Sequence, residues 1–387
     1  MISTSNYSLR RLLNRKIGLV TLLCWLACIA PAAARDLRIA VQQGKSQVAV
    51  GSSTTAQIFD GSGKQLGQLP ALQGYFASPA NGAITLADQQ AWRLIVKPTD
   101  GGFVYIDDQW YRGTVSLIHT SKGVTAVNNV DLEDYLASVV GKEVYKDWPA
   151  EVLKAQAVAA RSYALYKSQS SKSSFFDLGD SQTYQVYGGV NGEAPSTHAA
   201  VQATAGQVLT YGGKIINASF HASSGGHTEN SENVWSGALP YLRGVKDFDQ
   251  AAPKYQWTKT LTAMEAKQKL SGLGNIIAIK PLGKTFTGRI TNVEVVGDRG
   301  SRTMTGREMR TALGLNSTLF EVTPQPGLVA SQSGSTAPTG FQVTGKGHGH
   351  GLGMSQWGAL GLAKQGKTYD QILQHYYQGT ALSKGES

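Results

Sequence analysis

A run of alternating glycines near the C-terminal end constrains the fold more than any other stretch. The sequence "GKGHGHGLGMSQWGALGLAKQG" spans residues 345–366 and sets two histidines, a glutamine and a tryptophan among its glycines. So many glycines disfavour a regular helix, and a disordered linker would have no use for the tryptophan. The stretch therefore predicts a bent backbone that lies close to another part of the protein.

Residues 1–34 have the order of a secretory signal. Basic residues precede an apolar run from Ile17 to Ala30, and the small residues of "PAAAR" follow. This order predicts cleavage after about Ala34 and an exported protein of the periplasm or cell wall. The alternative is an uncleaved anchor, the one case in which the membrane would be a partner, although the run is short for a spanning helix.

Cysteine content and charge limit the function classes. Cys24 and Cys28 are the only cysteines, and both lie in the signal, so the exported chain would have no disulfide. The formal charge of +10 falls to +6 without the four basic residues of the signal. This excess suits an anionic or neutral polymer of the cell envelope. No nucleic-acid-binding motif accompanies it, so nucleic acid is not an expected partner.

The pattern of the remaining chain predicts an α+β fold. Short alternating runs separated by turn residues indicate a β-rich N-terminal region over residues 35–127. Residues 149–167 form the strongest predicted helix, with Pro149 in its first turn and a face of mostly small residues. We expect this helix, directly after Trp148, to be central to a mixed α/β core over residues 128–387.

Weaker sequence patterns predict further elements within that core. Residues 200–222 suggest a β-hairpin around Gly212 and Gly213. The stretches "TAMEAKQKLSG" and "RITNVEVVGD" favour a helix and a strand. Residues 324–340 are rich in Pro, Gly and Ser and read as a loop or linker. Thr368 is the expected N-cap of a last helix.

The histidines and serines of "HASSGGH" offer two kinds of site. Ser223 and Ser224 beside His221 and His227 would suit a serine hydrolase, but no strand-to-helix elbow surrounds them. The two histidines would suit a metal, but no carboxylate at metal-ligand spacing completes a set. Hydrogen-bonding loop residues are the simpler interpretation.

A carboxylate is the better candidate. Glu143 lies between the apolar "YLASVV" and the aromatics Tyr145 and Trp148. Apolar surroundings raise the pKa of a carboxyl, and a general acid for a glycosidic oxygen needs such a pKa. The alternative is a cap or a solvated charge. Glu133 and Asp134 are weaker candidates, because they open a helix in a polar setting.

Three long blocks resemble one known family. They are "DLEDYLASVVGKEVYKDWPAEVLKAQAVAARSYAL", "FHASSGGHTENSENVWSGALPYLRGV" and "GKGHGHGLGMSQWGALGLAKQGKTYDQILQHYYQGTAL". They are similar, in order, to the sporulation stage II protein D family, also called the amidase-enhancer LytB family. Together they cover roughly residues 128–383.

The resemblance implies a role in peptidoglycan. Members are lytic transglycosylases that act on glycan strands stripped of stem peptides, or activators of the amidase that strips them. The family's catalytic acid matches Glu143, which would protonate the leaving oxygen and then assist the sugar's own 6-hydroxyl. The implied partners are glycan strands and a cell-wall amidase. A plain wall-binding module is a third interpretation, but no repeat supports it.

The same resemblance implies further site residues. His348, His350 and Gln356 would line a groove with Trp357 as a stacking surface, or the histidines would tie the loop to the core near Glu143. Arg161, Ser223, Ser224 and Tyr241 lie in the matched blocks and are candidates for substrate binding. Some members bind zinc through cysteines, near whose places this chain has Gly179 and Tyr184. We therefore expect no metal and no cofactor.

Overall fold

The predicted signal lies outside the part of the chain that the computed structural model describes, which is residues 35–235, 237–326 and 338–384. Asp36–Gly385 form one compact unit. Within the described ranges, no helix is long and apolar enough to cross a membrane. Helices and strands are both abundant there, and the predicted α+β class is confirmed.

Two sheets make up the N-terminal region. The order is β13-β1-β12-β11-β8-β3-β4 in one sheet and β10-β9-β2-β5-β6-β7 in the other. Alternate residues such as Val48 and Val50 are fully buried, because successive side chains of a strand point to opposite faces. The strands are β1 (Asp36–Lys45), β2 (Val48–Ser52), β3 (Ala56–Asp60), β4 (Gln65–Leu69), β5 (Tyr75–Ala80), β6 (Ala83–Leu86), β7 (Gln89–Ala91), β8 (Arg93–Pro98), β9 (Val104–Ile106), β10 (Gln109–Tyr111), β11 (Thr114–Thr120), β12 (Gly123–Asp131) and β13 (Leu178–Gly179).

Strand β12 passes directly into the helical part. Its last residue, Asp131, accepts hydrogen bonds from the N–H groups of Glu133 and Asp134 and so caps α2 (Leu132–Glu143). Buried side chains of both sheets, of α2 and of α3 (Ala150–Ser170) belong to one hydrophobic core. The β-rich region is therefore continuous with the core that follows it.

Helix α3 is the helix predicted after Trp148, with Pro149 at its N-cap. On one side, Ala155 and Ala159 pack in a second core with residues of α7 (Gln356–Lys364) and α8 (Tyr369–Tyr376). The small side chains let these helices approach closely. The expected N-cap of α8, Thr368, is confirmed.

The predicted hairpin around Gly212 and Gly213 is also present. Both glycines have positive φ, 56° and 76°, the left-handed conformation that such a turn favours. Strand β24 pairs with the first strand of this hairpin. The elements of this part are η1 (Gly189–Gly192), α4 (Pro195–Ala203), β14 (Gln207–Tyr211), β15 (Lys214–Ile215), β16 (Phe220–His221), η2 (Ser231–Asn233), β23 (Met354–Ser355) and β24 (Ala381–Lys384).

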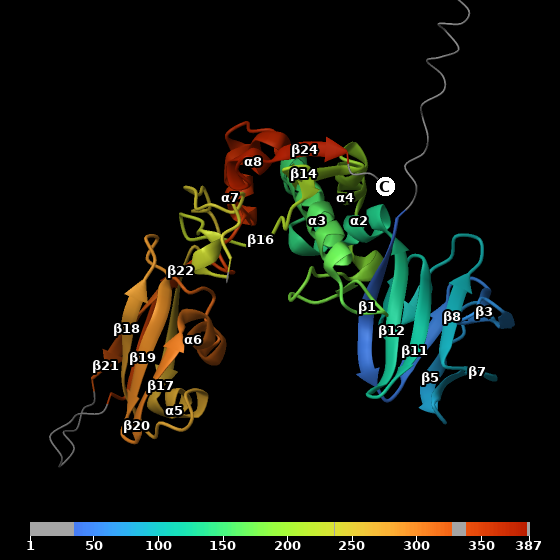
Figure 1. The fold of residues 1–387 in the computed structure, drawn as a ribbon, viewed down its shortest axis with the longest axis horizontal. Helices are drawn as coiled ribbons and strands as arrows, with labels where there is room; N and C mark the ends of the chain where they lie inside the picture. Colours follow the sequence, from blue (N-terminus) through green and yellow to red (C-terminus); the bar gives the residue numbers. More distant parts are fainter. Residues whose placement is uncertain (1–34, 236, 327–337, 385–387) are drawn as a thin grey trace, which may run out of the picture. The chain divides into compact units, whose positions relative to one another are not determined.

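Residues 256–346 form a lobe with its own hydrophobic core, which we call the 256–346 lobe and which the sequence did not predict as a separate part. Two three-stranded sheets, β17-β22-β21 and β18-β19-β20, carry α5 and α6 on the same side (Figure 1). The elements are β17 (Gln256–Thr262), α5 (Ala263–Lys269), β18 (Ile276–Lys284), β19 (Ile290–Gly297), β20 (Gly300–Thr305), α6 (Gly306–Leu313), β21 (Phe320–Gln325) and β22 (Gly340–Lys346).

The Pro/Gly/Ser-rich segment connects two strands of this lobe. Gln325 of β21 pairs with Gly340 of β22, so the segment leaves and re-enters the same sheet. It therefore joins neighbouring strands and does not separate two domains. Residues 327–337 lie outside the described residues.

Candidate active site

Glu143 is the last residue of α2. The preceding turns bury Leu136, Val139 and Val140 in the core, which leaves the carboxyl group at the end of an anchored helix. Its Oε1 accepts a hydrogen bond of 2.8 Å from the backbone N–H of Val186. Its Oε2 accepts one of 3.3 Å from Nε2 of Gln356. Both donors are neutral.

The surroundings of Glu143 favour its protonated form. Burial raises the pKa of this carboxyl, and the hydrogen bonds from Val186 and Gln356 offset only part of that rise. Among the described residues, no Lys, Arg or His lies within ion-pair distance of the carboxylate, although Lys142 is its chain neighbour. A carboxyl of this kind can hold a proton at a higher pH than a solvated glutamate.

A cleft of about 820 Å³ brings Glu143 together with distant parts of the chain. A typical binding site for a small ligand has a similar size. Parallel pairing of β16 with β23 places the second and third sequence blocks side by side. The lining includes Lys142, Glu143, Tyr163, Lys167, Tyr184, Val186, His221, Trp235, Arg307, Arg310, His348, His350 and Gln356.

A second cavity, of about 610 Å³, also borders Glu143 and Gln356. Three aromatic side chains line it, with ring centroids 5.4 Å apart for Tyr145 and Trp148 and 5.0 Å apart for Trp148 and Trp357. The predicted aromatic surface at Trp357 therefore belongs to this cavity. Glu143 therefore borders both cavities and is open to each of them.

The alternating glycines allow the loop that carries His348 and His350 to adopt its conformation and to pack closely against its neighbours. Gly349 and Gly351 have φ of 122° and 84°. A Cβ on Gly349 would come within 2.6 Å of the Cβ of His221, and one on Gly351 within 2.5 Å of the Arg289 guanidinium. The backbone can lie this close to its neighbours only because no side chain intervenes.

The two loop histidines differ. His348 is exposed at the cleft wall, and its backbone pairs with Ser223. The ring of His350 lies 5.3 Å from that of His221, and its Nδ1 accepts a hydrogen bond of 3.0 Å from the N–H of Leu352. Burial and the charges of Arg310 and Arg289 lower the pKa of His350 to about 4, so the ring is neutral at neutral pH.

Gln356 begins α7 and is only 6% exposed. Its Nε2 lies 3.3 Å from Oε2 of Glu143 and 3.5 Å from Oε1 of Gln156 in α3. The amide therefore links the third block to the first and orients the candidate acid. Gln356 also lines the cleft beside Glu143.

The other predicted binding residues lie outside the cleft lining. The Arg161 guanidinium, 1% exposed, donates bonds of 2.8 and 2.6 Å to Glu133. Tyr241 packs 5.8 Å from Tyr211 in the second core. Both side chains contact the scaffold, and their part in substrate binding stays a prediction.

Ser223 and Ser224 are also buried away from the cleft. Their hydroxyls donate hydrogen bonds of 2.5 Å to Asp249 and Asp247. These acceptors are carboxylates and not histidines, so the serine-hydrolase arrangement is not formed. The part of either serine in substrate binding stays a prediction, since neither lines the cleft.

His221 lines the cleft, whereas the sequence suggested it as a partner of the two serines or as a metal ligand. Its Nδ1 donates to the carbonyl of Leu352 over 3.1 Å, while Nε2 is buried without a hydrogen-bond partner among the described residues. Burial, together with His350, lowers the pKa of His221, so Nε2 is a neutral acceptor at the cleft. No three His, Cys, Asp or Glu side chains gather as metal ligands within the described ranges.

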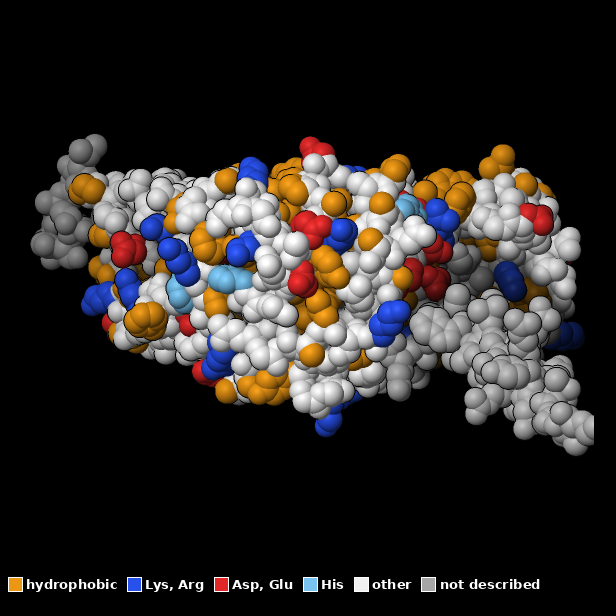
Figure 2. Space-filling view, turned by 90° about the horizontal axis from the view of Figure 1, so that it is seen from above, with side chains coloured by type: hydrophobic (Ala, Val, Ile, Leu, Met, Phe, Trp, Pro, Cys, Tyr) orange, Lys and Arg blue, Asp and Glu red, His pale blue; other side chains and the backbone are white. Residues whose placement is uncertain are grey.

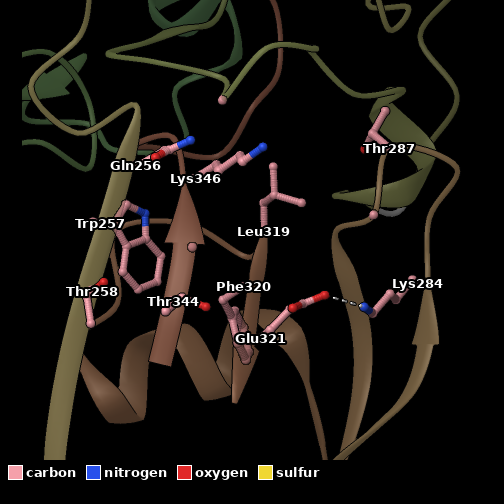
Figure 3. Close-up of a pocket in the computed structure, with 13 residues that line it drawn as sticks. Gln256, Trp257, Thr258, Lys284, Thr287, Leu319, Phe320, Glu321, Thr344 and Lys346 are labelled. Atoms are coloured by element: carbon pink, nitrogen blue, oxygen red, sulfur yellow. Dashed lines mark hydrogen bonds and ion pairs between the residues drawn. The ribbon is translucent and has the colours of Figure 1, made fainter. Parts of the chain in front are cut away.

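A further cavity of about 740 Å³ lies in the 256–346 lobe and shares no lining residue with the cleft (Figure 3). Trp257 and Phe320 contribute apolar surface, and Lys284 lies 3.5 Å from Glu321. Its only acid therefore has a cationic neighbour. This cavity lacks the isolated carboxyl that distinguishes the cleft.

Two family profiles match the chain. The family described as "Stage II sporulation protein" matches residues 120–211, which include Glu143, and a domain of unknown function matches residues 230–353. The second match contains the 256–346 lobe and both loop histidines.

Curated proteins from two genera are similar to the chain. Stage II sporulation protein D of Bacillus subtilis is 39% identical over 68% of this chain and 77% of its own length. An uncharacterized protein of Brachyspira hyodysenteriae is 36% identical over 74% and 76%. The amidase enhancer of Bacillus subtilis is 31% identical over 64% of this chain and 40% of its own length.

Proposed function

Since the chain belongs to the stage II sporulation protein D family, we propose that it is a cell-wall protein that cleaves peptidoglycan glycan strands as a lytic transglycosylase. The observation that carries the proposal is the carboxyl of Glu143. This carboxyl has no ion-pair partner among the described residues, burial raises its pKa, and it borders two cavities. The expected substrate is a strand already stripped of its stem peptides. Residues 1–34 would export the protein to the periplasm or cell wall.

One carboxyl can perform both steps. Protonated Glu143 gives its proton to the glycosidic oxygen that leaves C1 of N-acetylmuramic acid, and the C1–O bond breaks. The carboxylate then takes the proton of the sugar's 6-hydroxyl as that oxygen bonds to C1. The product has a 1,6-anhydro end, no water is consumed and the acid is regenerated. Val186 and Gln356 would hold the two carboxylate oxygens in place throughout.

Similarity to the amidase enhancer supports a second candidate function. In this alternative the chain binds the cell wall and activates an N-acetylmuramoyl-L-alanine amidase without cleaving glycan itself. The cleft would then serve binding, and Glu143 would have no chemical role.

Mass analysis of the products separates the two functions. The purified chain from residue 35 onward is incubated with amidase-stripped glycan strands, and 1,6-anhydro ends are expected. Intact, peptide-bearing sacculi should be cleaved poorly until an amidase has acted. Unchanged strands, together with faster release of peptides by an added amidase, would favour the activator. Equal rates on intact and stripped sacculi would contradict the substrate preference.

A further inference from the structure

The cleft beside Glu143 is strongly cationic. Its lining contains Lys142, Lys167, Arg307 and Arg310, whereas Glu143 is its only acid. In Figure 2, histidine side chains at the surface lie beside Lys and Arg side chains. A binding site for a neutral sugar polymer has no need of such an excess.

Two of these cations come from one helix, α6. Arg307 and Arg310 lie three positions apart on α6, so their side chains are neighbours on one face of the helix. Met309 and Leu313 anchor α6 in the core of the 256–346 lobe, and a capping box between Thr305 and Glu308 fixes its start.

Neither arginine has a carboxylate partner among the described residues. Nε of Arg310 donates to the carbonyl of Leu315 over 3.3 Å, which fixes the side chain but does not neutralise it. Burial, and then the charge of Arg307, lower the pKa of Arg310, so the two cations repel each other. An anion between them would relieve this repulsion through charge-assisted hydrogen bonds.

The pair does not act on the catalytic acid. The pKa of Glu143 is set by burial and by the hydrogen bonds from Val186 and Gln356. The arginines can therefore attract an anionic part of the substrate without removing the proton that the reaction needs.

Stripped glycan carries one suitable anion in each repeat. When an amidase hydrolyses the bond between the lactyl group of muramic acid and the first amino acid, the lactyl group is left as a free carboxylate. The sugars themselves are neutral. In an intact strand the same position is an amide without charge.

We infer that Arg307 and Arg310 bind the lactyl carboxylate of a stripped muramic acid and so make the cleft selective for strands on which an amidase has acted. This inference rests on the proposed function, because it assigns the cleft a glycan substrate. The arginines are specificity residues and take no part in proton transfer.

Binding by a catalytically disabled protein tests the inference separately from turnover. The Glu143→Gln protein is titrated calorimetrically with amidase-stripped strands and with the same strands after their lactyl carboxyls are converted to primary amides. Loss of charge-assisted hydrogen bonds should weaken binding of the amidated strands about 10- to 100-fold. Adding Arg307→Gln and Arg310→Gln should weaken binding of the carboxylate strands by the same factor and leave the amidated strands unaffected.

Arg302→Gln is the matched control, because Arg302 is exposed in the same lobe and absent from the cleft lining. If Arg310→Gln unfolds the lobe, Arg307→Gln alone keeps the test open, since Arg307 is exposed. Equal affinity for both strands, or a preference that survives the arginine substitutions, would overturn the inference. Selective binding without any cleavage by the wild-type protein would refute the proposed turnover and leave the arginine site standing.

Discussion

Two carboxylates of this protein, the partly buried Glu143 and the fully buried Asp247, differ in what surrounds them. Glu143 accepts hydrogen bonds from two neutral donors and borders two cavities. Asp247 is fully buried and accepts from the hydroxyls of Ser224 and Tyr376 and from the N–H of Phe248. Burial raises the pKa of both groups, and the nearby charge of Asp249 contributes at Asp247.

The difference shows that a raised pKa does not by itself mark a catalytic acid. Asp247 holds loops and helices together and is closed to a polymer. Glu143 has fewer internal partners, and its position beside open space lets a substrate reach its proton. Access, together with a raised pKa, separates the two groups.

The largest expected effect is on the rate. Glu143→Gln removes the proposed proton donor but keeps the shape of the side chain, so turnover on stripped strands should fall about 10²- to 10⁴-fold. The melting temperature should stay level or rise. Mass spectrometry of the anhydro ends measures the rate, and thermal unfolding measures the melting temperature.

Glu133→Gln is the control, because Glu133 lies on the same helix and partners the buried Arg161. It should lower stability and leave the rate of each folded molecule unchanged. Near-wild-type turnover by Glu143→Gln would show that the assignment of the acid is wrong.

The next effect is on stability, at the other carboxylate. Asp247→Ala leaves two buried hydroxyls and the partly buried N–H of Phe248 without an acceptor. Each buried donor is worth roughly 1–3 kcal/mol, so the free energy of unfolding should fall by about 3 kcal/mol or more. Urea denaturation of the wild-type and Asp247→Ala proteins measures this difference in the free energy of unfolding. A loss below about 1 kcal/mol would mean that this network does not hold the fold.

A smaller effect is expected in the glycine loop, where substitution of the two histidines should have different consequences for stability and strand affinity. His350→Ala leaves the Leu352 N–H without its acceptor and should cost about 1–3 kcal/mol of stability. His348→Ala removes an exposed side chain at the cleft wall and should change stability by less than about 0.5 kcal/mol. Its expected cost is in strand affinity, by about 2- to 10-fold.

Paired measurements of strand binding and thermal unfolding test both histidines. If His348→Ala lowers the melting temperature as much as it lowers binding, this histidine fastens the loop and does not line a groove. If His350→Ala is as stable as wild type but binds strands more weakly, His350 contributes to substrate binding and not to the fold.

The sequence predicted the features that depend on local pattern. The helix after Trp148, the alternating strands and the turn at Gly212 and Gly213 follow from periodicity and from glycine conformation, which short segments determine. The environment of Glu143 was also predictable, because its apolar and aromatic neighbours lie within a few residues.

Long-range partners could not be predicted. Nothing near Arg161 in the sequence indicates that Glu133 buries its charge, or that Asp247 and Asp249 engage the two serines. Arg307 and Arg310 lie outside the three family blocks of the sequence, and only the folded 256–346 lobe brings them to the cleft. The one signal for this site in the sequence was a pair of basic residues on a short helix. Such a pair is also typical of an ordinary solvent-exposed helix face.

The smallest effect is the pH dependence of stability at Glu143. Its folded-state pKa lies above the usual 4.5, so over a range of pH the folded protein keeps a proton that the unfolded chain has lost. The stabilisation from this proton is complete below about pH 4.5 and is lost as pH rises through the folded pKa. A tenfold difference in proton affinity between the folded and unfolded states corresponds to about 1.4 kcal/mol.

Glu143→Gln carries no ionisable group at this position, so its stability should rise relative to wild type over the same range of pH. Thermal unfolding of both proteins from about pH 4 to 8 measures the difference. The proposed reaction needs the same proton, so the rate on stripped strands should decline as pH rises through the same midpoint. A stability difference that is flat with pH, or that grows in favour of wild type, would mean that Glu143 is ordinarily solvated and would remove the physical basis for its role as the acid.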